Sequence, residues 1–350
     1  MNKNFNIGDF QLSEEGKTFI IAEMSANHMQ DYNRAVEIIK KAAWAGADAI
    51  KLQTYTPDTI TLDCDNEYFQ IKQGTIWDGT TLHKLYETAY TPWEWHEKLK
   101  EEAEKEGLVF FSSPFDFTAV DYLEKINVPA YKIASFEIND IPFIEYIASK
   151  GKPIIMSTGI ARIGDIQEAL DACRRMGNEK VALLKCTSSY PAPVEEANLK
   201  TIPNMKETFD VITGLSDHTM GHAVSVGGVA LGAKIIEKHM ILRRSDGGAD
   251  SKFSMEPEEF KEMVDNIRIV EKAVGKVSYD LSQKQINSRE HSRSLFVVDN
   301  VKKGEVFTEK NIKSIRPGFG LETKYIKDII GKTARMDIKK GTPMEWCLIE

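Results

Sequence analysis

The fold is decided by Gly214-Leu-Ser-Asp-His-Thr-Met220, a segment in which a histidine follows a short apolar run. The segment Ile236-Glu-Lys-His239 repeats this arrangement further along the chain. Similar apolar runs alternate with amphipathic segments from Phe19 to Val274, and each run has the length of a buried strand. The strands predicted in this way are Phe19–Met24, Ala49–Gln53, Val109–Ser112, Ala130–Ile133, Pro153–Ser157, Val181–Lys185, Val211–Gly214 and Lys234–Glu237.

The segments between these strands carry the apolar periodicity of helices, most clearly at Arg34–Ala45, Trp93–Lys105, Ile163–Met176, Ala223–Leu231 and Glu258–Val274. A series of eight strands, each followed by a helix, is typical of a (β/α)8 TIM barrel. The strands are nearly continuous apolar runs, as expected where both faces are buried. A doubly wound open sheet is the alternative. Its dinucleotide-binding form is disfavoured because no GxGxxG motif follows the first strand.

We assign residues 1–277 to the barrel, 278–290 to a polar linker and 291–350 to a small β-clip domain. In the last of these, Asn300-Val-Lys-Lys-Gly304 is echoed by Asp337-Ile-Lys-Lys-Gly341, which predicts a pseudo-symmetric pair of strand–turn–strand units. A module of about 60 residues is marginal for independent stability, so we expect it to dock on something larger.

A long insertion, residues 54–90, follows the second predicted strand and contains Tyr68, Phe69 and Trp77. Loops after the strands build the active face of a TIM barrel. Two interpretations remain open: the insertion contacts a substrate, or it only covers the rim.

Composition excludes several classes of function. The net charge of −8 disfavours a nucleic-acid partner. No apolar run approaches the roughly 20 residues that span a bilayer, and the first residues lack the apolar core of a signal peptide. Cys64, Cys173, Cys186 and Cys347 are scattered without metal-site spacing, as expected of reduced thiols in a cytoplasmic protein.

Polar and charged residues recur where the predicted strands end, which is the catalytic face of a TIM barrel. These residues are Glu23, Lys51, Gln53, Ser112, Ser113, Lys132, Ser135, Glu137, Thr158, Gly159, Thr187, Ser188, Tyr190, Ser216, Asp217, His218, Glu237, Lys238 and His239. Lysine supplies positive charge and hydroxyls supply directional donors, a combination suited to a phosphate group.

His218 and His239 follow neighbouring strands, so we expect them to lie side by side and to bind one divalent metal. Two protein ligands would leave positions open for water and substrate, and imidazole with oxygen suits Mn²⁺, Fe²⁺, Co²⁺ or Zn²⁺. We interpret His83, His96, His222 and His291 as structural.

These motifs resemble the sialic acid synthase family over essentially the whole chain. The resemblance rests on Ile21-Ala-Glu-Met-Ser-Ala-Asn-His28, Lys51-Leu-Gln-Thr, Ser112-Ser-Pro-Phe, Tyr131-Lys-Ile-Ala-Ser135, Lys185-Cys-Thr-Ser-Ser-Tyr-Pro191, Gly214-Leu-Ser-Asp-His-Thr and Glu237-Lys-His239. The end of the chain, with Arg316-Pro-Gly-Phe-Gly320, resembles the antifreeze-like (SAF) domain that closes proteins of this family.

The resemblance implies an enzyme that condenses phosphoenolpyruvate with the open-chain aldehyde of an amino sugar. It implies that phosphoenolpyruvate is bound by Lys51, Ser113, Lys132, Ser135, Ser188 and Ser216, and that Mn²⁺ is bound by His218 and His239. Glu23 and Glu137 are the two carboxylates that could stabilise a cation or activate water. The family also implies a domain-swapped homodimer, in which Arg316 reaches the barrel of the partner subunit. On the sugar side we expect Gln53, Tyr190, Asp250 and Arg316.

Within the family, the chain is most similar to the branch that makes pseudaminic acid. This similarity rests on Met24-Ser-Ala-Asn-His28, Gln53-Thr-Tyr-Thr-Pro-Asp58, Thr91-Pro-Trp-Glu-Trp-His96 and Asp250-Ser-Lys-Phe-Ser254. The neuraminate branch usually has Gly and Asn around the first motif and Asn in place of Ser188.

The expected sugar is therefore 2,4-diacetamido-2,4,6-trideoxy-L-altrose, with a neuraminate or legionaminate synthase as the alternative. Two rival classes are a Schiff-base aldolase that uses Lys132 or Lys185, and a non-catalytic binding protein.

Overall fold

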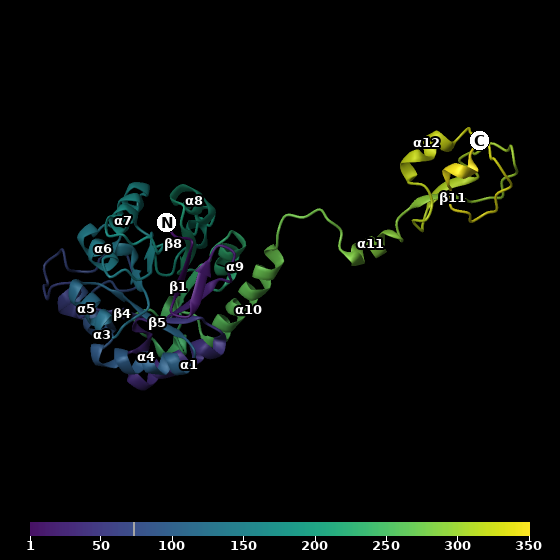
Figure 1. Cartoon of the computed structure of the whole chain (residues 1–350). Helices are drawn as coiled ribbons and strands as arrows, with labels where there is room; N and C mark the ends of the chain where they lie inside the picture. Colours follow the sequence, from purple (N-terminus) through teal and green to yellow (C-terminus); the bar gives the residue numbers. More distant parts are fainter. Residues whose placement is uncertain (73) are drawn as a thin grey trace. The chain divides into compact units, whose positions relative to one another are not determined.

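The computed structural model describes residues 1–72 and 74–350 and divides them into two compact units, Met1–Gly275 and Lys276–Glu350. The first unit contains a closed barrel of eight parallel strands surrounded by helices (Figure 1), which confirms the predicted TIM barrel. In chain order the strands are β3 (Phe19–Glu23), β4 (Ala49–Thr54), β5 (Val109–Pro114), β6 (Tyr131–Ile133), β7 (Ile154–Ser157), β8 (Val181–Cys186), β9 (Ile212–Asp217) and β10 (Ile235–His239).

The barrel closes where the last strand pairs with the first, in a parallel register that runs from Ile235↔Phe19 to His239↔Glu23. Five strands extend further at their C-terminal ends than the sequence predicted, and two of these extensions matter for the site: β9 continues to Asp217 and β10 includes His239. His218 therefore follows its strand directly, and His239 is the final residue of its own strand.

The helices that surround the barrel begin at local capping signals. Asp31 accepts hydrogen bonds from Asn33 N and Arg34 N at the start of α1 (Tyr32–Ala45), and Asp116 caps α5 (Phe117–Lys125) in the same way. The other helices that pack on the barrel are α4 (His96–Lys105), α6 (Ile141–Ala148), α7 (Ile163–Arg175), α8 (Thr201–Phe209), α9 (Ala223–Ala230) and α10 (Pro257–Val274). Over the residues described here, none of the helices has the length and apolar character that a bilayer crossing demands.

The interior of the barrel is apolar at the N-terminal ends of the strands and polar at their C-terminal ends. An N-terminal hairpin of β1 (Asn4–Ile7) and β2 (Phe10–Ser13), which the sequence analysis did not identify, packs Phe5, Ile7 and Leu12 against Phe19 and Phe111. This buried floor supports the polar side chains above it. A second apolar core lies between the strands and the helices.

The insertion after β4 contains two helices, α2 (Pro57–Ile60) and α3 (Leu82–Ala89). An antiparallel bridge between Gln70 and Thr81 draws it into a compact loop. Position 73 of the insertion lies outside the described residues.

The second unit contains α11 (Gln283–Arg289), which lies in the segment we expected to be a linker, followed by β11 (Ser294–Val297), β12 (Ile312–Ile315) and α12 (Ile326–Ile329). The two echoed segments pair with each other. Lys303 N donates to Asp337 Oδ1 at 2.9 Å, and Lys340 N donates to Asn300 Oδ1, also at 2.9 Å. Equivalent positions of the repeat therefore exchange equivalent hydrogen bonds, as its pseudo-symmetry predicts.

Two buried histidines outside the barrel interior make the stability of the fold depend on pH. His96 Nε2 lies 2.9 Å from Thr54 Oγ1, and His28 Nε2 lies 2.9 Å from Thr91 Oγ1. Burial lowers the pKa of each histidine to about 4. In the unfolded chain a histidine takes up a proton at about pH 6.5. Each buried histidine therefore contributes to the free energy of unfolding above pH 6.5, and this contribution is lost as the pH falls towards 4.

We therefore expect His96→Gln to flatten the pH dependence of unfolding. Between pH 7 and pH 5 the variant should lose roughly 2 kcal/mol less unfolding free energy than the parent protein, because one depressed pKa has been removed. Urea unfolding followed by circular dichroism at both pH values measures this difference. His291→Gln is the control, since His291 is exposed. An unchanged pH dependence in His96→Gln would contradict the assignment.

Candidate active site

A cluster of buried charges lies at the C-terminal ends of β3, β4, β6 and β10. Lys51 Nζ lies 2.5 Å from Glu23 Oε2 and donates to Ser113 Oγ at 3.2 Å. Burial lowers the pKa of Lys51, but the carboxylates of Glu23 and Glu237 more than reverse this effect. Burial also raises the pKa of Glu23, although Lys51 opposes it. The structure thus brings Glu23, Lys51 and Ser113 together, as the barrel rule predicts.

Glu237 is the centre of this cluster, and the sequence analysis gave it no role. Lys132 Nζ donates to its two carboxylate oxygens at 2.7 and 3.0 Å, and Ser216 Oγ donates to Oε1 at 3.1 Å. Burial alone would raise the pKa of Glu237, but Lys132 and Lys51 hold it at about 2. The alternation of side chains along a strand could have predicted this position, because Glu237 lies two residues before His239 and therefore on the same face of β10.

His218 and His239 lie side by side, with ring centroids 5.4 Å apart. His218 Nδ1 lies 3.0 Å from the carbonyl oxygen of Thr187, which leaves Nε2 as its nitrogen for a ligand. His239 Nδ1 is buried, has no hydrogen-bond partner in the part of the chain that the structure describes, and lies 4.0 Å from Asp250 Oδ2. Burial and the neighbouring His218 lower the pKa of His239 and favour the neutral, metal-binding form.

The two histidines therefore fit a divalent metal, but as a pair rather than a complete set of ligands. Within residues 1–72 and 74–350, no group of three or more His, Cys, Asp or Glu side chains is arranged to hold a metal ion. A metal bound by this pair would need further ligands from water or substrate, as in a Lewis-acid site.

A second ion pair lies behind the histidines, on the outer face of the barrel. Lys238 Nζ donates to Asp217 Oδ2 at 2.8 Å, and these two residues are register partners on β10 and β9. Ser225 Oγ on α9 donates to the same carboxylate oxygen at 2.6 Å. Because Asp217 precedes His218 and Lys238 precedes His239, this pair fixes the two strand ends that carry the histidines.

Two aromatic rings pack against the histidine pair, and a third packs on one of them. The Tyr190 ring lies 4.5 Å from the His218 ring, and the Phe253 ring lies 4.9 Å from the His239 ring. Trp77, from the long insertion, packs on Tyr190 at 5.5 Å. The insertion therefore reaches the wall of the site, which favours the first of the two interpretations left open for it.

The hydroxyls expected to bind phosphate converge on a glycine. A Cβ atom at Gly159 would lie 2.1 Å from Ser188 Oγ and 2.7 Å from Ser135 Oγ, so this position requires glycine. Gly159 N donates to Ser135 Oγ at 3.0 Å, while Ser188 Oγ is buried without a partner among the described residues. An unsatisfied buried hydroxyl beside a backbone amide is suited to an anionic oxygen.

The remaining expected site residues on the barrel are Glu137, Gln53 and Asp250. Burial raises the pKa of Glu137 to about 7, and its Oε2 atom is buried without a partner among the described residues. Gln53 Nε2 donates to Glu23 Oε1 at 3.1 Å and to Ser25 Oγ at 2.9 Å. Asp250 Oδ2 accepts from Ala26 N at 3.3 Å. Glu137 is thus poised to exchange a proton near neutral pH.

Arg316 is the expected site residue that does not belong to the barrel. It lies in the second unit, where a cis peptide bond joins it to Pro317. Pro317 O accepts a hydrogen bond from Ser294 Oγ at 2.7 Å.

Of the two lysines considered for a Schiff base, Lys132 is held in an ion pair and Lys185 hydrogen-bonds only to neutral groups. Lys132 is paired with Glu237, and Lys185 Nζ donates to Cys186 O at 2.7 Å. A Schiff-base lysine needs a neutral amine in a desolvated pocket, so the ion pair of Lys132 argues against that mechanism.

Comparison with known proteins agrees with this geometry. A pseudaminic acid synthase from Campylobacter jejuni is 48% identical over 97% of this chain and 98% of its own. An N,N'-diacetyllegionaminic acid synthase from the same species is 37% identical over 93% of this chain and 98% of its own. The crystal structure of an N-acetylneuraminic acid (sialic acid) synthetase from Leptospira borgpetersenii, 31% identical, superposes with a TM-score of 0.72, covering 82% of this chain and 96% of that chain.

Two sequence families match adjacent parts of the chain. The SAF domain matches residues 292–349, which lie in the second unit. The NeuB family matches residues 38–279, well over half of the chain, and the relatives above extend the similarity to nearly its full length. The chain therefore belongs to the NeuB family and ends in a SAF domain.

Proposed function

We propose that this protein is a pseudaminic acid synthase, which condenses phosphoenolpyruvate with 2,4-diacetamido-2,4,6-trideoxy-L-altrose and releases phosphate. The observation that carries the proposal is the placement of two buried lysines and two neighbouring histidines on one rim of the barrel. The identity of 48% to a pseudaminic acid synthase, against 37% to a legionaminic acid synthase, supports the choice of sugar.

In the proposed mechanism, Lys51, Lys132 and Ser113 hold the anionic groups of phosphoenolpyruvate. Ser135, Ser188 and Ser216 add hydroxyl donors. The buried position of both lysines strengthens their attraction to a phosphate. Glu23 and Glu237 hold the lysines in place before the substrate arrives, so the site is preorganised.

The carbon–carbon bond forms between C3 of phosphoenolpyruvate and the aldehyde carbon of the sugar. His218 and His239 would bind Mn²⁺, which when present supplies Lewis-acid polarisation of the aldehyde oxygen. Attack by C3 breaks the C=O π bond of the aldehyde, whose oxygen takes up a proton, and leaves a cation at C2, where water adds. We propose that Glu137 accepts the proton of that water, because its Oε2 atom is buried without a hydrogen-bond partner among the described residues, while Glu23 is paired with Lys51. The C2–O bond to phosphate then breaks, giving the 2-keto acid.

On the sugar side we propose Gln53, Tyr190 and Asp250, with Arg316 supplied by the SAF domain of the other subunit in a domain-swapped homodimer. We also propose that the enzyme works in the cytoplasm, where its four free cysteines stay reduced. Recovery of the enzyme in a periplasmic or extracellular fraction would contradict that location.

A test of the proposed function is a panel of sugars. With phosphoenolpyruvate and Mn²⁺, we expect 2,4-diacetamido-2,4,6-trideoxy-L-altrose to give a higher kcat/KM than N-acetylmannosamine or 2,4-diacetamido-2,4,6-trideoxymannose. The margin should be about 10-fold or more, since one group matched to its pocket is worth about 1–3 kcal/mol. Phosphate release and mass spectrometry of the product measure it. A competitor that equals or exceeds the altrose sugar would show that the branch assignment is wrong.

A second prediction concerns the histidine pair and the shared site. His218→Ala should lower Mn²⁺ affinity in calorimetry and remove most activity, because one of two protein ligands is lost. Arg316→Ala should remove activity without affecting Mn²⁺ binding.

Mixing the two inactive proteins under conditions of subunit exchange should restore activity, since a crossed dimer holds one site free of both defects. Undiminished Mn²⁺ affinity in His218→Ala would refute the metal site. Failure to recover activity, with heterodimers demonstrated, would refute the swap.

A third prediction is a pH profile. Glu137 must be ionised to accept a proton, so we expect kcat to rise with pH through about 7, the pKa to which burial raises this carboxyl group. Glu137→Gln should lower kcat by about 10²-fold or more and abolish this rise. Glu23→Gln is the comparison, because it should lower activity but keep the rise. If instead Glu23→Gln abolishes it, the two roles are reversed.

A further inference from the structure

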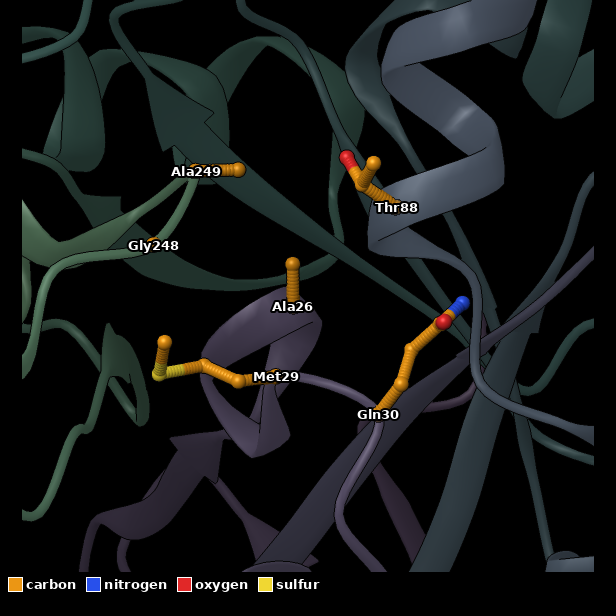
Figure 2. A pocket seen from close by; sticks show the side chains of 6 residues that line it. All are labelled: Ala26, Met29, Gln30, Thr88, Gly248 and Ala249. Atoms are coloured by element: carbon orange, nitrogen blue, oxygen red, sulfur yellow. The ribbon is translucent and has the colours of Figure 1, made fainter.

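A pocket of about 290 Å³ lies on the rim of the barrel, next to the site just described (Figure 2). It is lined by Ala26, Met29, Gln30, Thr88, Gly248 and Ala249. These residues come from the loop after β3, from the end of α3 in the insertion, and from the segment after β10. Three segments far apart in the sequence therefore build one pocket, and the proposed mechanism gives this pocket no role.

The pocket shares its inner wall with the proposed sugar site. Ala249 O accepts a hydrogen bond from Trp77 Nε1 at 2.9 Å, and Trp77 packs on Tyr190. On the same wall, Ala26 N donates to Asp250 Oδ2, which lies 4.0 Å from His239 Nδ1. A single carboxylate thus separates the pocket from the histidine pair.

The loop that forms one side of the pocket is held in an unusual conformation. Ser25, Met29 and Gln30 have φ values of 46°, 51° and 55°, in the left-handed region that residues other than glycine seldom adopt. His28 Nδ1 accepts from Gln30 N at 2.9 Å, and Gln30 Nε2 donates to Glu87 O at 2.8 Å. Strained residues persist only where their surroundings hold them, and they concentrate at functional sites.

The lining has the chemistry of a receptor for a small amide with an apolar end. Ala26, Met29 and Ala249 present apolar side chains, and Thr88 lies on the opposite side, as Figure 2 shows. The Thr88 hydroxyl donates to Leu85 O at 2.8 Å, so its oxygen is left to accept a hydrogen bond from an amide N–H. The amide of Gln30 is engaged with Glu87. No lining residue is charged, so the pocket does not match a carboxylate or a phosphate. Mostly apolar walls with a few polar groups are typical of sites that bind neutral small groups.

We propose that this pocket receives the acylamino group at C4 of the sugar and thereby selects sugars that carry one. This inference rests on the proposed function, in which the aldehyde carbon lies by His218 and His239. An open-chain sugar that starts there and passes Asp250 directs its C4 substituent towards Ala26 and Ala249. A hydroxyl at C4, as in N-acetylmannosamine, would leave the apolar walls without a partner.

Two variants test the pocket in opposite directions. Ala26→Leu fills it, and we expect KM for the diacetamido sugar to rise about 10-fold or more, while the 2-acetamido analogue with a hydroxyl at C4 is unaffected. Met29→Ala enlarges it, and we expect a relative gain in kcat/KM of about 5-fold or more for the 4-propanamido analogue over the 4-acetamido sugar.

Met176→Ala is the matched control, because Met176 is 42% exposed and Met29 is 41% exposed, and Met176 caps α7 away from the pocket. Circular dichroism and kinetics with the 4-hydroxy analogue verify that each variant is folded. The pocket proposal is overturned if the variants change kcat/KM equally for the 4-acylamino and 4-hydroxy sugars, or if Met29→Ala behaves like Met176→Ala. A parent enzyme that does not use the diacetamido sugar at all would instead overturn the proposed function and, with it, this inference.

Discussion

The site depends on keeping four charges buried at the mouth of an apolar barrel. Removing an ion from water costs several kcal/mol unless an opposite charge and hydrogen bonds replace the lost hydration. Here Lys51 faces Glu23, Lys132 faces Glu237, and serine hydroxyls occupy further positions around them. Each of these strand ends must therefore place its charged side chain within reach of the opposite charge on another strand. The geometry of the site thus depends on the closure of the barrel.

This arrangement also explains why the lysines suit an anionic substrate. An anion that enters the mouth meets two ammonium groups whose position is already set, so little reorganisation accompanies binding. The carboxylates that hold the lysines repel an anion. The Ser188 hydroxyl, which has no hydrogen-bond partner among the described residues, lies beside the side-chain-free Gly159 and can donate a hydrogen bond that offsets part of this repulsion. From the balance of these effects we expect the site to favour a group that accepts several hydrogen bonds at once.

The sequence predicted the barrel because buried parallel strands give continuous apolar runs. It also predicted which polar side chains gather at one end of the barrel, because the C-terminal ends of parallel strands lie on one face. It did not identify the N-terminal hairpin, whose strands are only four residues long. It also gave Glu237 no role, because its partner Lys132 is 105 residues away and only the closed barrel brings the two together. The position of Trp77 could not be predicted for a similar reason, because the path of the long insertion that carries it is not indicated by the local sequence.

The ion pair on the outer face of β9 and β10 has a consequence for how this chain can evolve. Successive residues of a strand point to opposite faces, so the loss or gain of one residue exchanges the two faces. A residue inserted before Glu237 would move Glu237 to the outward position opposite Asp217, and would move Lys238 to the inward position of His239, on the same face as Lys51 and Lys132. Three cations would then crowd one buried space and two anions another. This strand end should thus tolerate substitution far better than any insertion or deletion.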